Sequence, residues 1–410
     1  MRRLLGTVAA GNAFYGPLLR QAGLDENLES LDEFFARMPF TEKAAIVADQ
    51  RQHPPFGTNL SYPLTAYNRF TETSATSGPP LRWLDTPQSW QWMLDNWKVV
   101  LQAAGVTRRD RLYFAFSFGP FLGFWTAFEA AVQLGCLCIP GGGLSSLARL
   151  EAMRDNQATV LACTPTYALR LAEVAAAESV DLGTLGIHTI LVAGEPGGSV
   201  PAVRASIERC WHGARVFDHH GMTEVGPVSY QCPEQPGTLM VIETSYLAEI
   251  IDPQSTQPVE RGAAGELVLT TLGRLGSPLI RYRTGDMVCA DTEIAQRYGR
   301  RELALKGGIL GRTDDMVVVR GVNLYPAAVE DMMRSIPEVA EYRVELHTRR
   351  AMTELHLHVE AIPDTIDGPA LAKKVRTKMR SLFHLRVPIT ICRPGTLPRF
   401  EMKGRRWTRC

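Results

Sequence analysis

The stretch RLYFAFSFGPFLGFWTAFEAAVQLGCLCIP (111–140) begins a pattern in which a short apolar run is followed by a helical pattern and then by another apolar run. Further apolar runs, each preceded by a helix-like segment, occur at TVLAC (159–163), TILVA (189–193) and RVFD (215–218). Such alternation is typical of a parallel sheet with helices on both faces. We therefore expect an α/β fold with a doubly wound, mostly parallel sheet, in which ligands bind beyond the carboxyl ends of the strands.

The pattern changes twice toward the C-terminus. Residues 241–289 contain strand-like segments separated by turns, which indicates a β-rich subdomain. After Asp314 and Asp315, two alternating runs (YRVEL and ELHLHVE) and two helical patterns predict a small α+β domain. The expected domains are therefore 1–313 and 314–410.

The charges are balanced overall but uneven along the chain. With 44 Lys+Arg and 43 Asp+Glu the net charge is +1, which gives no electrostatic reason to bind nucleic acid or an acidic membrane surface. Residues 315–410 carry 17 basic and 11 acidic side chains, so the predicted small domain is basic. This fits a basic cap that closes on an anionic ligand, and equally a solvated basic face.

Targeting and membrane signals are weak. The sequence MRRLLGTVAA (1–10) lacks the hydrophobic region of a signal peptide, and the least charged stretch, 112–128, falls short of a bilayer span. The 8 cysteines form no CxxC pair, which favours reduced thiols. These features predict a cytoplasmic protein with neither nucleic acid nor membrane as a partner.

Six segments carry polar groups that could contact a phosphate, a sugar or a metal ion. They are TETSATSGPP (71–80), GEPGG (194–198), HHGMTE (219–224), RYRTGD (281–286), GRTDDMVVVRGVNLYP (311–326) and LPRFEMKGRR (397–406). Hydroxyls and small residues let backbone N–H groups approach phosphate oxygens, and glycines after a parallel strand let a flat ligand approach the backbone. Taken singly, each segment is equally typical of an ordinary turn or surface loop.

Some of these segments contain specific candidate ligands. Glu224, at the end of a predicted strand, could bind a hard divalent cation. His219 and His220 point to opposite sides of an extended chain, so a two-histidine metal site is not expected. Asp286 follows a Thr-Gly turn and is placed to accept both hydroxyls of a ribose, with Arg312 as a further donor.

In this order and spacing, the six segments resemble the motifs of the adenylate-forming (acyl-CoA synthetase, luciferase) superfamily, and most closely those of the phenylacetate-CoA ligase family. The likeness extends from AFYGPLLRQAGL (13–24) to Lys403 and covers nearly the whole chain. It implies a large adenylate-forming domain and a small mobile domain. It further implies an enzyme that uses ATP and Mg²⁺ to activate a carboxylic acid, aromatic or similarly compact, and then transfers the acyl group from the adenylate to coenzyme A.

The resemblance also implies a role for each matching residue. Lys403 matches the lysine that enters from the small domain to stabilise the adenylation transition state, Thr223 the α-phosphate contact, and Glu224 the Mg²⁺ ligand. Asp314 falls on the hinge about which the small domain rotates. The residues implied to bind ATP through its phosphates, adenine or ribose are Ser74, Thr76, Ser77, Gly194, Glu195, Pro196, His219, His220, Gly221, Met222, Asp286 and Arg312.

The acyl pocket is expected near the aromatic segment 116–125 and the glycines at 141–143. Its predicted lining residues are Phe118, Phe121, Gly142 and Ala193. Aromatic residues at helical spacing are also typical of a protein core. We therefore expect only one or two of the four rings in this segment to contact the acid, the four being Phe118, Phe121, Phe124 and Trp125.

The sequence departs from the family pattern in three places. The phosphate loop has Ala75 at the position of a glycine and Pro79 at that of a lysine, which removes one phosphate contact. His220 stands where relatives commonly have tyrosine. Some relatives have zinc-binding cysteines near Cys232 and before the GRxDD segment, but here residues 296–303 read QRYGRREL, so no structural zinc is expected.

Other functions stay open on the sequence. The acceptor could be another thiol, a carrier protein, an amine or a hydroxyl in place of coenzyme A. The altered phosphate loop is also compatible with a nucleotide-binding homologue of low activity. A homodimer is left open as well.

Overall fold

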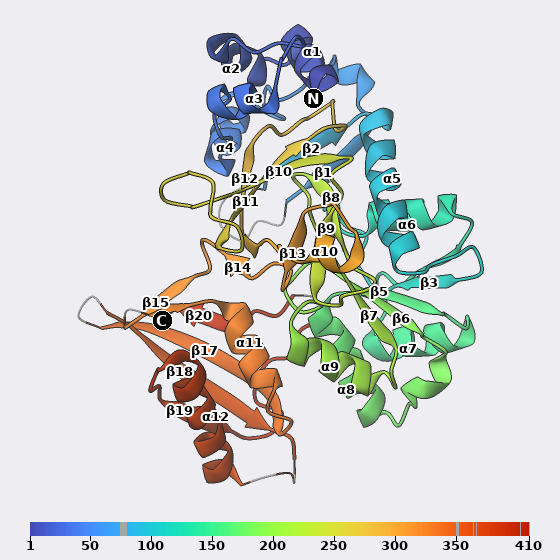
Figure 1. Cartoon of the computed structure of the whole chain (residues 1–410). Helices are drawn as coiled ribbons and strands as arrows, with labels where there is room; N and C mark the ends of the chain where they lie inside the picture. Colours follow the sequence, from blue (N-terminus) through green and yellow to red (C-terminus); the bar gives the residue numbers. More distant parts are fainter. Residues whose placement is uncertain are drawn as a thin grey trace.

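The computed structural model describes residues 1–73, 80–320, 322–349, 352–363, 365, 367–401 and 403–409 (Figure 1). The centre of the fold is an eight-stranded sheet in the order β13-β9-β8-β7-β6-β5-β3-β4. Its five parallel strands are β3 (Arg111–Phe114), β4 (Leu137–Pro140), β5 (Val160–Cys163), β6 (Thr189–Val192) and β7 (Arg215–Met222). Three antiparallel strands extend the sheet beyond β7, namely β8 (Gly226–Gln231), β9 (Thr238–Val241) and β13 (Ala304–Lys306). The predicted mostly parallel sheet is confirmed.

Helices cover both faces of the parallel strands, as the alternation predicts. One face carries α5 (Pro87–Ala103) and α6 (Trp125–Gln133), and the other carries α7 (Ser146–Asp155), α8 (Pro165–Ala177) and α9 (Pro201–Cys210). The strands alternate accordingly. Leu112 and Phe114 of β3 lie in the core with α5 and α6, whereas Tyr113 lies in the core with α7, α8 and α9.

The starts of three of these helices are capped by hydroxyl side chains. Thr86, Ser145 and Thr164 each accept a backbone N–H from the first turn of α5, α7 and α8, respectively. Pro87 and Pro165 stand at the beginning of α5 and α8, where the missing N–H costs nothing. These caps fix the start of α8, which contributes to the site described below.

The β-rich subdomain is an antiparallel sheet in the order β10-β11-β12-β14. Its strands are β10 (Tyr246–Ile251), β11 (Ala264–Thr271), β12 (Tyr282–Cys289) and β14 (Gly311–Arg312). Four N-terminal helices are α1 (Arg2–Gly11), α2 (Tyr15–Ala22), α3 (Leu31–Arg37) and α4 (Lys43–Gln52). Leu275 and Ile280 lie in the core of these helices and join them to the subdomain. The remaining short elements of the large domain are η1 (Leu64–Ala66), β1 (Arg69–Glu72), β2 (Arg82–Asp85), η2 (Leu182–Leu185) and α10 (Ile294–Tyr298).

The C-terminal part has the expected α+β fold, drawn in orange and red in Figure 1. After β15 (Val317–Val319) and β16 (Val322–Leu324) comes a four-stranded sheet in the order β19-β18-β17-β20. The elements are α11 (Pro326–Arg334), β17 (Val339–Arg349), β18 (Met352–Ala361), α12 (Gly368–Phe383), β19 (Ile389–Cys392) and β20 (Trp407–Arg409). Val344 and Leu357 of the sheet are fully buried in a core shared with α11 and α12.

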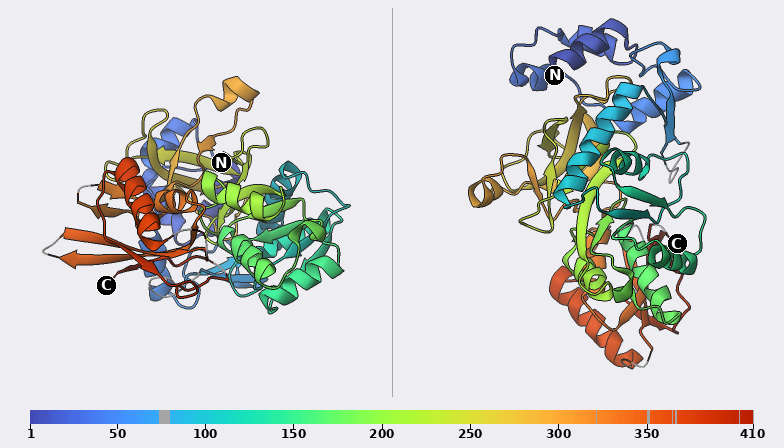
Figure 2. Two further views of the ribbon diagram at one scale, coloured as in Figure 1. Left: turned by 90° about the horizontal axis from the view of Figure 1, so that it is seen from below. Right: turned by 90° about the vertical axis from the view of Figure 1, so that its right-hand side faces the viewer.

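The C-terminal domain contacts helices α8 and α9 of the large domain. The Asp331 carboxylate of α11 accepts the backbone N–H of Ala202 in α9 at 2.9 Å. Arg399 Nε lies 3.2 Å from the Glu173 carboxylate of α8. In Figure 1 and in the right-hand view of Figure 2, the N-terminal helices and the C-terminal domain lie at opposite ends of the molecule.

Membrane-spanning helices and disulfides are absent from the described part of the chain. No helix in the described ranges is long and apolar enough to cross a membrane. The seven cysteines within those ranges are free thiols.

Candidate functional site

The turn after β6 carries the GEPGG segment and lies against the C-terminal segment. Gly194 is exposed and has a φ of +95°, a backbone conformation that favours glycine. A Cβ atom at this position would lie 3.5 Å from Cε of Lys403. The lysine of the small domain therefore reaches over the carboxyl end of β6.

Glu195 joins the two domains through its carboxylate. Oε1 accepts the backbone N–H of Thr166 at the start of α8, and Oε2 accepts that of Gly404, both at 2.8 Å. Burial raises the pKa of this carboxyl, although the hydrogen bonds and the charge of Arg406 act in the opposite direction. The side chain of a residue predicted to line the adenine thus also holds the Lys403 loop beside α8.

Strand β7 continues through the HHGM segment because residues 219–222 pair with β8. His219 and His220 point to opposite sides of it. The His219 ring is buried, with its centroid 4.1 Å from that of Trp97, and Nδ1 donates to the Ser229 carbonyl at 2.6 Å. Burial lowers the pKa of His219 to about 3, so this imidazole is neutral at pH 7. His219 therefore packs in the core beside Trp97.

His220, on the other side of β7, joins Asp286 of β12 and Arg312 of β14. Nε2 of His220 lies 3.0 Å from Oδ2 of Asp286, and Nη1 of Arg312 lies 3.1 Å from Oδ1. Because a carboxylate only accepts hydrogen bonds, Nε2 is the donor of this contact, and the other ring nitrogen is Nδ1. This Nδ1 is buried and has no hydrogen-bond partner among the described residues. The three side chains therefore form a connected polar group with unused acceptor capacity.

The carboxylates around Arg312 keep its guanidinium charged. Burial disfavours a charged guanidinium, but Asp286, Asp314 and Asp315 outweigh burial and raise the pKa of Arg312. Asp286 and Arg312 are also direct partners in the pairing of β12 with β14. The sheet thus fixes the carboxylate and the guanidinium against each other.

The turn after β7 is held from behind by a buried ion pair. Nη1 of Arg274 donates to the backbone carbonyls of Thr223 and Glu224, each at 2.8 Å. The same guanidinium binds both carboxylate oxygens of Asp85, at 2.7 and 2.6 Å. Both side chains are fully buried, so this bidentate pair fixes the backbone that carries Thr223 and Glu224.

Glu224 faces a lysine from the N-terminal helices. Its Oε1 lies 3.1 Å from Nζ of Lys43, at the start of α4. The Glu224 side chain is 10% exposed and that of Lys43 is 51% exposed. A carboxylate oxygen is a ligand that Mg²⁺ prefers, so Glu224 fits the predicted metal ligand, with an ammonium group beside it.

The residues predicted to bind the acid follow three parallel strands: Phe118 and Phe121 come after β3, Gly142 after β4 and Ala193 after β6. A Cβ atom on Gly142 would lie 3.6 Å from Cδ2 of Phe118. Phe118, Phe121 and Ala193 are half-buried, whereas Phe124 is buried. Phe118 and Phe121 are therefore better placed than Phe124 to line a pocket.

The predicted hinge residue lies where the chain passes from one domain to the other. Asp314 stands between β14 and β15, and its side chain is 67% exposed. Its Oδ1 accepts a hydrogen bond from Nε of Arg312 at 2.9 Å. A rotation at this point would change the contact with Arg312.

The remaining predicted ATP contacts lie after β6, at the end of β7 and in the phosphate loop. Pro196 is exposed in the turn after β6, and Gly221 and Met222 are half-buried at the end of β7. The phosphate-loop residues lie outside the described residues, and they are Ser74, Ala75, Thr76, Ser77 and Pro79.

Sequence reasoning does not single out Lys43, Asp85 or Arg274. Arg274 and Asp85 are 189 residues apart, and Lys43 and Glu224 are 181 residues apart. None of these three lies in the six segments that suggest chemistry. The one sequence feature that could have pointed to Lys43 is its place at the end of PFTEK (39–43), within the region that resembles the family.

Comparisons with known proteins bear on this site. Residues 73–273 match the family model of the AMP-binding enzyme, and residues 321–408 match that of the AMP-binding enzyme C-terminal domain. The chain is 30% identical to the phenylacetate-coenzyme A ligase of Thermus thermophilus, over 98% of this chain and 92% of that protein.

Two solved structures of one ligase are similar to this chain to different degrees. The crystal structure of 2-hydroxyisobutyryl-CoA ligase in the postadenylation state, in complex with 2-HIB-AMP, has a TM-score of 0.93 at 26% identity, covering 100% of this chain and 88% of that one. Its complex with 2-HIB-AMP and CoA in the thioesterification state has a TM-score of 0.73 at the same 26% identity, covering 100% and 87%.

Proposed function

Because the chain belongs to the phenylacetate-coenzyme A ligase family of adenylate-forming enzymes, we propose that it acts on a compact aromatic carboxylic acid and that the site residues above divide the work. The chain is an AMP-forming acid–thiol ligase, which activates its acid as an acyl-adenylate and then transfers the acyl group to coenzyme A.

The first step brings two anions together. A carboxylate oxygen bonds to the α-phosphorus of ATP while the bond to the β-phosphate oxygen breaks and pyrophosphate leaves. In the second step the thiol sulfur bonds to the acyl carbon and AMP leaves. The developing charge of the first step requires cations and N–H donors that are already in place.

Lys403 supplies such a cation in our proposal. The position of Lys403 beside Gly194, at the carboxyl end of β6, carries this assignment. The next residue, Gly404, donates a backbone hydrogen bond to Glu195. An ammonium group on a flexible stem is suited to delivery by a domain that closes. Thr223, held by Arg274, would donate to the α-phosphate from the neighbouring turn.

The group of His220, Asp286 and Arg312 binds the nucleoside in this proposal. Asp286 keeps a free lone pair on each oxygen for the ribose hydroxyls, although both oxygens already accept one hydrogen bond. The buried Nδ1 of His220 lacks a donor among the described residues, and an adenosine hydroxyl or amino group would satisfy it.

Glu224 would hold Mg²⁺, whose charge screens the phosphate oxygens when it is bound. Lys43, beside Glu224, adds a second positive charge from the N-terminal helices. This lysine would partly offset the loss of the phosphate-loop lysine, whose position is taken by Pro79. Lys43 therefore belongs to our proposed phosphate-binding set.

The proposed acid is aromatic because the rings of Phe118 and Phe121 are half-buried in the segment after β3, where Phe118 lies next to Gly142. The phenylacetate-coenzyme A ligase of Thermus thermophilus supports the same class of acid.

We further propose that domains 1–313 and 314–410 rotate about Asp314 between the two steps. The higher TM-score with the postadenylation structure than with the thioesterification structure supports an arrangement of this chain that is suited to the adenylation step. In that arrangement Lys403 is engaged.

Substrate class is tested by mass spectrometry of acyl-coenzyme A products. The purified enzyme is incubated with ATP, Mg²⁺, coenzyme A and single acids, including phenylacetate, benzoate and 2-hydroxyisobutyrate. We expect an aryl acid to give the highest kcat/KM. A clear preference for the short aliphatic acid would overturn the aromatic assignment, and absence of every acyl-coenzyme A would overturn the choice of acceptor.

A further inference from the structure

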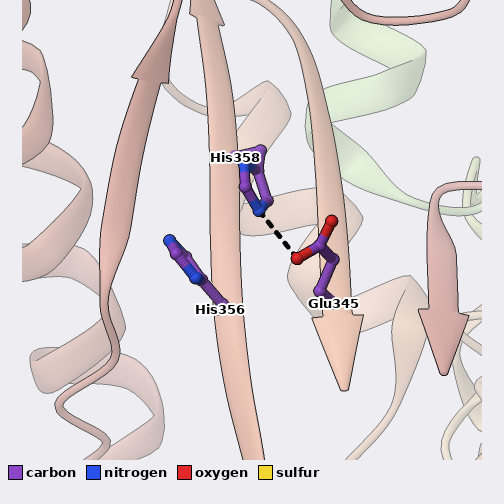
Figure 3. A group of neighbouring side chains, drawn as sticks. All are labelled: Glu345, His356 and His358. Atoms are coloured by element: carbon purple, nitrogen blue, oxygen red, sulfur yellow. Dashed lines mark ion pairs between the residues drawn. The ribbon is translucent and has the colours of Figure 1, made fainter. Parts of the chain in front are cut away.

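Three side chains that could bind a metal gather on the C-terminal sheet, apart from the adenylation site (Figure 3). They are Glu345 of β17 and His356 and His358 of β18, and each can offer one ligand atom with all three atoms within 4.8 Å of one another. None of them belongs to the six segments that suggested chemistry.

The strand geometry places these side chains on one face. Residues two apart on a strand point the same way, so His356 and His358 share a face. Glu345 is the direct cross-strand partner of His356. The alternate residues Val344 and Leu357 point into the core with α11 and α12, so the three side chains lie on the opposite face of the sheet.

The contacts converge on one carboxylate oxygen. Oε2 of Glu345 lies 3.1 Å from Nε2 of His358, the pair joined by the dashed line in Figure 3. The same oxygen lies 3.4 Å from Nε2 of His347. The rings of His356 and His358 are stacked, with centroids 4.4 Å apart. Two imidazoles therefore contact one acidic oxygen, and a third is stacked on one of them.

The surroundings can orient the ligands. Thr390 of β19 lies 2.8 Å from Nε2 of His356, so its hydroxyl can hold that ring by the nitrogen that does not bind the metal. Arg343 pairs with the other oxygen of Glu345, Oε1, and leaves Oε2 for the ion. The adjacent guanidinium lowers the affinity for any cation, so a metal must bind through strong imidazole bonds rather than through charge alone.

We propose that Glu345, His356 and His358 form a binding site for a divalent transition-metal ion such as Zn²⁺. Two imidazoles and one carboxylate favour Zn²⁺ and its neighbours over Mg²⁺, which prefers oxygen ligands. The site moves with the domain that carries Lys403, since β17 also pairs with β20 next to the C-terminal segment.

The test is calorimetric titration of the nucleotide-free full-length chain with ZnCl₂. We expect one Zn²⁺ per chain in the wild type. Removal of a ligand should cost at least as much as removal of an orienting group, so the double variant H356Q/H358Q should bind at least about 10- to 100-fold more weakly. T390V should lose roughly tenfold by the same principle.

The matched control is H188Q. Nε2 of His188 lies 3.1 Å from the carboxylate of Asp110 in the large domain. It is therefore a histidine–carboxylate pair like that of His358 and Glu345, but without a stacked second histidine. This variant should bind Zn²⁺ like the wild type. Equal affinity in the wild type and in H356Q/H358Q, or no binding by the wild type, would overturn the proposal.

A measurement on the wild type alone covers the case in which a variant fails to fold. Diethyl pyrocarbonate modifies free imidazoles, and mass spectrometry locates the modified histidines. Zn²⁺ should protect His356 and His358 and leave His188 unchanged. Equal modification of all three with and without Zn²⁺ would contradict the site.

Discussion

Replacing Glu195 by glutamine tests whether this carboxylate holds the Lys403 loop in place for adenylation. The carboxylate accepts two backbone N–H groups, from Thr166 and Gly404, each at 2.8 Å. Glutamine keeps the size of the side chain but has one acceptor oxygen and one NH₂ group. One of the two amides must therefore lose its acceptor.

The expected magnitude follows from that loss. A buried donor left without a partner costs about 1–3 kcal/mol, which corresponds to about 5- to 150-fold in the population of the closed arrangement. The loss falls on adenylation alone, because the contact with Gly404 belongs to the arrangement that resembles the postadenylation structure.

The assay separates the two half-reactions. Adenylation is measured as acid-dependent exchange of labelled pyrophosphate into ATP. Thioester formation is measured from chemically prepared acyl-adenylate and coenzyme A. E195Q should slow the first by the factor above and leave the second within about twofold of the wild type.

The matched control is E173Q, which removes another carboxylate that crosses the same domain boundary. Its partner is Arg399 at 3.2 Å, and its side chain is 36% exposed, so it should cost less than about 1 kcal/mol. Equal losses of E195Q in both half-reactions, or no loss in either, would refute the reasoning.

Three more predictions concern the phosphates, the ribose and the response to acid. K43M should lower kcat of adenylation by about 100-fold because Glu224 loses its neighbouring cation. The control K98M removes the surface ion pair between Lys98 and Asp95 and should not change kcat. D286N should raise KM for ATP by roughly 10- to 100-fold, measured by steady-state kinetics, since it removes charge-assisted bonds to two partners, and an unchanged KM would exclude the ribose contact. His219 has a pKa lowered to about 3, so the unfolded chain takes up a proton below about pH 6.5 that the folded chain does not, and stability falls as the pH falls. Between pH 6.5 and 5 this group should cost about 2 kcal/mol in urea unfolding, and H219Q should lack that part of the loss.

The sequence predicts most of the fold because local patterns decide it. The apolar runs before residue 218 mark the parallel strands, and the alternation of Leu112, Tyr113 and Phe114 sends successive side chains to opposite faces. Strand β7 runs four residues beyond the predicted RVFD, to Met222, since pairing with β8 supplies its hydrogen bonds where the apolar pattern has ended.

The site is less well predicted where contacts join distant parts of the chain. His220, Asp286 and Arg312 fall in recognisable segments and do meet in the structure. The Lys43–Glu224 pair has no local pattern, because a lysine at the start of α4 resembles any exposed cation until the fold brings it to the turn after β7. The contact of Glu195 with Gly404 is likewise invisible in the sequence, since the two residues are far apart in the chain and meet across the domain boundary.

The most direct test of the account is pyrophosphate release from ATP by the wild type and by K403A, across aryl acids, with and without coenzyme A. We expect acid-dependent release that coenzyme A accelerates in the wild type. In K403A the release should fall by at least about 100-fold, while ATP binding, followed by calorimetry, changes little. Release at the same rate in both proteins would contradict the role of Lys403 in adenylation.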